Sequence, residues 1–196
     1  YIIQGRMDPS SLMISIEPGY IASIPPQTDI ANFTEEALLL MDGRICSIYE
    51  ANGKDLNGDP KMHVVSPEKG TVSTLKFPNV EYRITDATEL DSNNRFWVLN
   101  YLWSGDRKDL YTGPDPLVEK YGVGKSHLSN EAVERIIQMK MVDGQVVISD
   151  APPLYLHLQG DASRNWEGIA RLNDRGFFIV TDKYPETILG FVEHTQ

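Results

Sequence analysis

The sequence has almost no cysteine: Cys46 is the only one in 196 residues. A single cysteine excludes a disulfide within the chain and a zinc site built from Cys and His ligands. Cys46 lies in the apolar run Ile45–Ile48, so we expect a small core residue at this position. No stretch approaches the roughly 18 apolar residues of a membrane span, and no signal-peptide pattern is present. We therefore expect no membrane span.

Positive charge is also scarce. The chain has 18 Lys and Arg residues against 28 Asp and Glu residues, which gives a formal net charge of -10 at pH 7. A surface this negative repels phosphate backbones and anionic lipids, so no nucleic-acid partner is expected. Two explanations of the charge stay open, namely simple solubility and a preference for cationic ligands.

Long segments with helical periodicity are lacking as well. Short apolar runs rich in Ile, Val, Phe, Trp and Tyr alternate with turn sequences such as Asp42-Gly43 and Asp143-Gly144. These features are typical of half-buried strands joined by tight hairpins. The pattern predicts an all-β protein of roughly fourteen strands, with a hairpin over residues 134–148.

Residues 102–130 differ from the rest of the chain. Glycine and proline residues recur through this segment, and it shows little of the pattern expected of β-strands. We predict a long inserted loop there, and loops of this length are usually functional or mobile. His127, within the loop, could reach a pocket. Trp97, Trp103 and Trp166 are expected to pack between sheets, and Trp103, beside the insertion, could instead line a pocket.

Three segments share one plan: Glu36–Glu50, Asp86–Asn100 and Glu167–Asp182. Each begins with an acidic residue, continues through two apolar runs joined by a tight turn, and ends with a polar residue 14 or 15 positions later. The first two segments start 50 residues apart, and the third follows at a similar interval once the inserted loop is discounted. Periods of about 40–50 residues with four strands each are typical of β-propellers.

We therefore predict a β-propeller with repeated antiparallel blades beginning near residues 36, 86 and 167, as one domain over residues 1–196. The alternative is a β-sandwich, which gives the repeated acid–small dipeptide no role. Fourteen strands fill only about three and a half blades, and closed propellers typically have four to eight. The chain is thus expected to be part of a larger propeller of about six blades, completed by a missing propeller segment or by a second copy.

The last blade is expected to lack its outer strand unless the N-terminal region supplies one. Leu12–Ile16 is the candidate for that strand. A compact four-bladed ring closed by residues 1–30 is the rival arrangement.

The acids that open the repeats are expected to lie at one end of successive sheets, around the propeller axis. Carboxylates gathered in this way repel one another unless a cation or hydrogen-bond donors compensate. We therefore predict a metal site, with Ca²⁺ as the expected ion, whose ligands are Glu36, Glu50, Asp86, Asn100 and Glu167. In the alternative, each acid bonds the backbone of the neighbouring blade and holds the ring together.

Short motifs in these segments resemble a known family. Asn165–Ala170 followed by Gly176–Asp182 resembles the "esterase-like activity of phytase" family of β-propellers. Thr85–Leu90 with Phe96–Leu99 is similar to a second segment of that family, and Glu35–Asn52 is similar to an earlier blade. Six-bladed lactonase-like propellers show a weaker similarity.

The resemblance implies a metal-dependent hydrolase that acts on an ester or phosphoester, a small-molecule substrate, and an extracellular or periplasmic location. The metal would polarise the substrate and activate water, and a carboxylate among Glu167, Asp182 and Asp86 would act as general base. The sequence departs from the family pattern at Asn100 and at Lys183. These departures favour the alternative function, a non-catalytic binding scaffold with a structural calcium.

Overall fold

The computed structural model describes residues 1–196 except 68–69, 112, 159, 161–162, 184–185 and 195–196. The described chain is mostly β structure: four small antiparallel sheets account for its strands, and helices for 9% of it. The prediction of a β protein is therefore confirmed. The fourteen strands among the described residues also match the number counted from the sequence.

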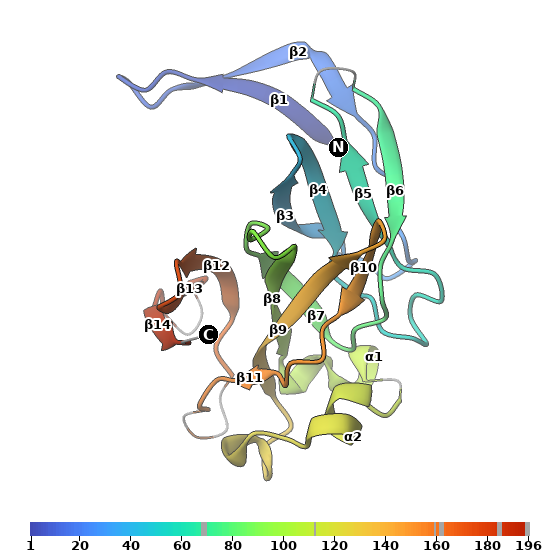
Figure 1. Ribbon diagram of the computed structural model, residues 1–196, viewed down its shortest axis with the longest axis vertical. Helices are drawn as coiled ribbons and strands as arrows, with labels where there is room; N and C mark the ends of the chain where they lie inside the picture. Colours follow the sequence, from blue (N-terminus) through green and yellow to red (C-terminus); the bar gives the residue numbers. More distant parts are fainter. Residues whose placement is uncertain (68–69, 112, 159, 161–162, 184–185, 195–196) are drawn as a thin grey trace.

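An N-terminal hairpin forms a sheet of its own. Strands β1 (Ile2–Met7) and β2 (Ile14–Ala22) pair with each other and extend away from the other sheets, at the opposite end of the molecule from the helices (Figure 1). Much of the hairpin's apolar surface is exposed, including Ile14 and Ile16. The prediction that Leu12–Ile16 completes the last sheet is wrong for the described chain, because the strand partner of β2 is β1.

Sheet I contains β3 (Glu35–Met41), β4 (Arg44–Tyr49), β5 (Lys61–Val65) and β6 (Val72–Lys76), paired in sequence order. The tight turn between β3 and β4 has positive φ angles at both of its central residues, Asp42 and Gly43, as the Asp-Gly pair predicts.

Sheet II contains β7 (Arg83–Ala87), β8 (Arg95–Leu102), β9 (Val133–Val142) and β10 (Gln145–Ile148), also in sequence order. The short strand β11 (Leu154–Tyr155) pairs with residues 135–136 of β9, on the edge that β10 also occupies and opposite β8. The predicted hairpin over residues 134–148 is confirmed by β9 and β10.

The inserted segment lies between β8 and β9 and is partly helical. It contains, in order, η1 (Ser104–Asp106), α1 (Arg107–Leu110), α2 (Pro116–Tyr121) and η2 (Lys125–His127). Helix α2 begins where the Asp115 side chain accepts a hydrogen bond from the backbone N–H of Leu117, with Pro116 in the first turn. This is a helix-start signal that the loop prediction missed.

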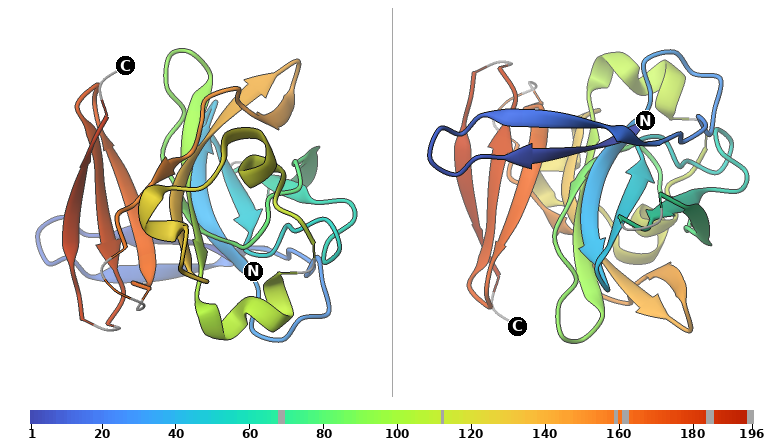
Figure 2. Two further views of the ribbon diagram at one scale, coloured as in Figure 1. Left: turned by 90° about the horizontal axis from the view of Figure 1, so that it is seen from below. Right: turned by 90° about the horizontal axis from the view of Figure 1, so that it is seen from above.

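Sheet III contains β12 (Trp166–Leu172), β13 (Gly176–Thr181) and β14 (Leu189–Glu193). The first strands of the three larger sheets lie together, with β7 in contact with both β3 and β12 (Figures 1 and 2). The starts of these three strands therefore meet in one region of the molecule.

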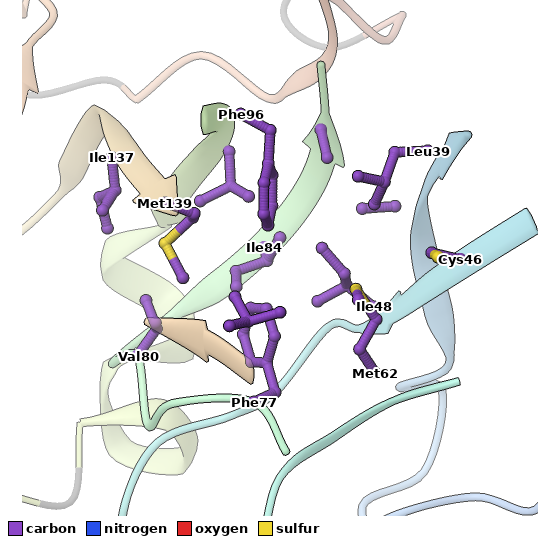
Figure 3. Packing of buried hydrophobic residues seen from close by; sticks show 14 of the residues in the cluster. Leu39, Cys46, Ile48, Met62, Phe77, Val80, Ile84, Phe96, Ile137 and Met139 are labelled. Carbon is purple, nitrogen blue, oxygen red and sulfur yellow. The ribbon is translucent and has the colours of Figure 1, made fainter. Parts of the chain in front are cut away.

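Two apolar clusters join the sheets. One contains Cys46, Ile48, Ile84 and Phe96 and lies between sheets I and II (Figure 3). The other lies between sheets II and III, where the rings of Trp97 and Phe177 are 5.4 Å apart, and Trp166 belongs to it. The predicted core positions of Cys46, Trp97 and Trp166 are confirmed. The prediction that Trp103 packs between sheets is wrong, because its side chain is 53% exposed.

Candidate acidic site at the starts of the inner strands

A β-bulge interrupts the first hairpin of each larger sheet at its open end. One residue of the first strand has no partner on the second strand: Glu36 in sheet I, Thr85 in sheet II and Glu167 in sheet III. Asp86 is therefore offset by one position from Glu36 and Glu167. Because successive strand residues face opposite sides, this offset separates Asp86 from the two glutamates.

Arg83, at the start of β7, lies among the carboxyl groups of this region. Its Nη2 atom is 3.2 Å from Oδ2 of Asp106, and its guanidinium lies 4.8 Å from the centre of the Phe33 ring. Its Nε atom is 3.2 Å from Oε1 of Glu50, in a charge contact too bent for a hydrogen bond. Because Asp106 belongs to η1, the inserted segment reaches this site.

Burial and mutual repulsion raise the pKa values of two of these acids, Glu50 and Glu167, toward neutral pH. Burial raises the pKa of Glu50 to about 8, opposed by Arg83 and reinforced by Glu36, Glu167 and Asp106. Burial also raises the pKa of Glu167 to about 7, with Glu36 next in effect and Asp182 contributing.

We call the acidic cluster the group of Glu36, Glu50, Asp106, Glu167 and Asp182, in which Arg83 contacts Glu50 and Asp106. Two of its carboxyl groups, those of Glu50 and Glu167, titrate in the range useful for general acid–base catalysis. The structure thus brings together four of the acids named from the sequence, namely Glu36, Glu50, Glu167 and Asp182.

Asp86 has a different environment. Its Oδ2 atom accepts a hydrogen bond of 2.7 Å from the backbone N–H of Ile169, and burial raises its pKa against the effect of this bond. The neighbouring Thr85 hydroxyl donates a 2.7 Å bond to the carbonyl of Trp166. Both residues therefore join sheet II to β12, which is the alternative that the sequence left open for the repeat acids.

Asn100 is buried, and both the nitrogen and the oxygen of its side-chain amide form hydrogen bonds. Its Nδ2 atom donates to the carbonyls of Glu81 and Arg83 at 2.8 and 2.9 Å, and its Oδ1 atom accepts from Nε of Arg135 at 2.7 Å. Asn100 therefore positions the backbone of Arg83.

The five residues predicted as metal ligands do not form a preformed metal centre in the described chain. Within the described ranges, no three His, Cys, Asp or Glu residues are arranged to hold a metal ion. Of the five predicted ligands, Asp86 and Asn100 form other bonds, and Arg83 already supplies positive charge to Glu50 and Glu167. The calcium site stays a prediction, and the mechanism below takes no step through a metal.

Arg83 and Asp106 were missed by sequence reasoning. Arg83 is three residues before Asp86, the acid that opens the second repeat, and a basic residue beside a predicted ring of acids was the available signal. Asp106 offered no signal, because its contact with Arg83 depends on how the inserted segment folds. His127 does line a cavity, as anticipated, although that cavity is distinct from the acidic cluster.

Comparison with protein-family models finds no match for this chain, and a search of curated proteins finds no significantly similar sequence. The family resemblance drawn from short motifs stays a prediction. No helix in the described part of the chain is long and apolar enough to cross a membrane.

Proposed function

We propose that sheets I, II and III are successive blades of a β-propeller and that the acidic cluster is a hydrolytic site on its axis. Support for the propeller comes from the strand order, since the strands of each of these sheets pair in sequence order as a meander. The contacts of β7 with β3 and β12 place these first strands around a common region. Both features are typical of propellers.

Three blades do not close a ring, so the proposal requires a partner: further blades or a second copy of the chain. The exposed apolar side chains of the N-terminal hairpin and of sheet III, such as Ile16, Phe178 and Phe191, favour such a partner. Light scattering after size exclusion should therefore show a species larger than the 22.1 kDa monomer. A compact, stable monomer at all concentrations would contradict this expectation.

The titration of Glu50 and Glu167 carries the hydrolytic proposal. Pairs of acids whose environments set different pKa values commonly divide the roles of acid and base. Glu167, with the lower value, is the proposed base, and Glu50, with the higher value, is the proposed acid.

In the proposed reaction, ionised Glu167 removes a proton from water while the water oxygen bonds to the carbonyl carbon of an ester. Arg83 stabilises the oxyanion that forms. The bond to the leaving oxygen then breaks, and protonated Glu50 gives its proton to that oxygen. The products are an acid and an alcohol, and a proton passing from Glu167 to Glu50 through solvent restores both groups.

The charge of the cluster favours a neutral substrate. The cluster holds five carboxyl groups against the one guanidinium of Arg83, so a phosphate monoester dianion would meet repulsion that a carboxylic ester or a lactone would not. Of the two substrate classes implied by the sequence, we therefore propose the carboxylic ester.

The test is the hydrolysis of 4-nitrophenyl acetate and 4-nitrophenyl phosphate near pH 7, in EDTA and in millimolar calcium. The acetate should be the better substrate, and Glu167→Gln should lower kcat/KM by about 100-fold or more. Glu193→Gln, which removes an exposed acid of β14 outside the cluster, is the matched control. An equal loss in both variants would contradict the assignment, and inactivity in EDTA would contradict a reaction without metal.

A non-catalytic binding scaffold is the second candidate. The structural bonds of Asp86 and Asn100 favour it, because they account for two polar residues of the repeat without any reaction. Absence of turnover on both substrates would favour this candidate.

A further inference from the structure

Sheet III has an apolar face that the described chain leaves exposed. Phe178 of β13 is paired in register with Phe191 of β14, and their rings lie 5.4 Å apart. These residues are 39% and 47% exposed, and Leu189, two positions along the same face of β14, is 72% exposed. The opposite face of sheet III packs on sheet II through Phe177 and Ile179. Sheet III lies at one side of the molecule (Figure 2), and we call its exposed side, with Phe178, Leu189 and Phe191, the open face.

The N-terminal hairpin has an exposed apolar face as well. Met7 of β1 is paired with Ile14 of β2, and Ile16 follows two positions later on the same side. The exposed fractions of Met7, Ile14 and Ile16 are 57%, 69% and 61%. The other side of the hairpin carries the ion pair of Arg6 and Glu17, at 3.2 Å. We call the side with Met7, Ile14 and Ile16 the arm face. Because a two-stranded hairpin is at best marginally stable alone in water, the arm face needs a cover.

The open face and the arm face have the same chemistry and lie in different parts of the molecule. The hairpin extends away from the sheets at one end (Figure 1), and both faces are exposed in the single chain. Neither set of three residues includes a polar side chain, so burying one set against the other leaves no polar group unpaired. Two copies of the chain can therefore cover all four faces between them.

We propose that the arm face of one copy packs on the open face of sheet III of a second copy, and that the two copies exchange their hairpins reciprocally. Reciprocal exchange gives a closed, two-fold symmetric dimer. The contact is between faces, so β1 stays paired with β2. Such a dimer gives the three blades the partner that the proposed propeller requires, so the exchange rests on that proposal.

The exposed area is sufficient for a stable dimer. A large apolar residue presents on the order of 200 Å² when it is fully exposed. With the exposed fractions of the six residues, the two symmetric contacts would cover about 1,400 Å², and specific interfaces cover about 1,200–2,000 Å². A membrane surface is a less suitable cover, because a net charge of -10 is repelled by anionic lipids.

Cross-linking through introduced cysteines tests which faces meet. Cys46 is the only cysteine and is fully buried, so a cysteine at position 16 or 191 is the accessible thiol. Ile16→Cys and Phe191→Cys chains are co-expressed and treated with a short bismaleimide. We expect a covalent dimer that contains one chain of each variant, identified by intact mass. Such a product joins two chains, so it excludes a hairpin folded onto its own sheet III.

The matched control replaces Phe191→Cys by Val142→Cys, at a residue of β9 that is 41% exposed and outside both faces. Little mixed dimer should form with this control. Absence of the Ile16–Phe191 product, or equal yields with Phe191→Cys and Val142→Cys, overturns the exchange.

Light scattering of charged variants measures the strength of the contact. The wild type should have twice the 22.1 kDa mass of the monomer. Ile16→Lys and Phe191→Lys should each raise the dimer Kd by about 30-fold or more, the change expected for a hot-spot residue. Leu38→Lys, at a 54% exposed residue of β3 in sheet I, should leave the dimer intact. Retention of the dimer by both of the first two variants, or its loss in Leu38→Lys, overturns the exchange.

Hydrolysis of 4-nitrophenyl acetate by the wild type separates this proposal from the hydrolytic one, because neither face contains a residue of the acidic cluster. A monomeric but active wild type refutes the hairpin exchange and leaves the hydrolytic site in place. An inactive dimer with the Ile16–Phe191 cross-link supports the exchange and refutes the hydrolytic site.

Discussion

Between pH 5 and pH 9, Glu50 alone should lower the free energy of unfolding by about 4 kcal/mol, and Glu50→Gln should remove this part of the fall. Glu50 is 4% exposed, and burial raises its pKa from an ordinary value of 4.5 to about 8. The folded protein therefore holds this proton more tightly than the unfolded chain does. The resulting stabilisation is fully present below pH 4.5 and is lost as the pH rises to about 8.

Urea unfolding at several pH values measures this effect. Glu167 contributes in the same direction over a lower range, because its pKa is raised to about 7. Glu193→Gln, outside the cluster, should retain the slope of the wild type. If Glu50→Gln also retains that slope, the protonated state of Glu50 in the folded protein is disproved.

Removal of Arg135 should destabilise the protein by about 3–5 kcal/mol. Its side chain is fully buried, donates to Oδ1 of Asn100, and lies 2.7 Å from the Asp115 carboxylate. In Arg135→Ala this carboxylate would remain buried without a compensating charge, which is the costly case for a buried ion pair.

A double variant distinguishes the effect of losing the Arg135–Asp115 ion pair from the effect of burying an unpaired charge. In Arg135→Met combined with Asp115→Asn both charges are absent and Asn still caps α2, so a large part of the lost stability should return. Arg171→Ala, at a partly exposed arginine, should cost about 1 kcal/mol or less. Thermal and urea unfolding of the three variants measure these differences. A double variant as unstable as Arg135→Ala would show that the packing of the arginine side chain, and not its charge, is what the fold requires.

Local signals in the sequence predicted the strands and hairpins well. The positive φ angles of Asp42-Gly43 and Asp143-Gly144 are what these dipeptides favour, and β3–β4 and β9–β10 meet at these turns. The alternation of apolar residues predicted which strands have a buried face. These features depend on a few neighbouring residues, so they can be deduced from the chain alone.

The candidate site was predicted only in part, because it depends on the register in which the strands pair. The spacings of 14 and 15 residues between the ends of the repeats suggested that Asp86 is equivalent to Glu36 and Glu167. The bulge at Thr85 places Asp86 on the opposite side, and whether a strand contains a bulge depends on packing between sheets. The contact of Arg83 with Asp106 likewise joins residues far apart in sequence, through an inserted segment whose fold had been predicted only as a loop.

The bulges also determine where each first strand can lose a residue. Glu36, Thr85 and Glu167 have no partner on the neighbouring strand, so deletion of any one of them leaves the paired residues on both sides in register. Deletion of a paired residue would instead turn the following side chains to the opposite face of the sheet. In β3 and β12 the residue that can be lost in this way is an acid of the cluster. A change in chain length can therefore remove charge from the site while the sheets keep their pairing.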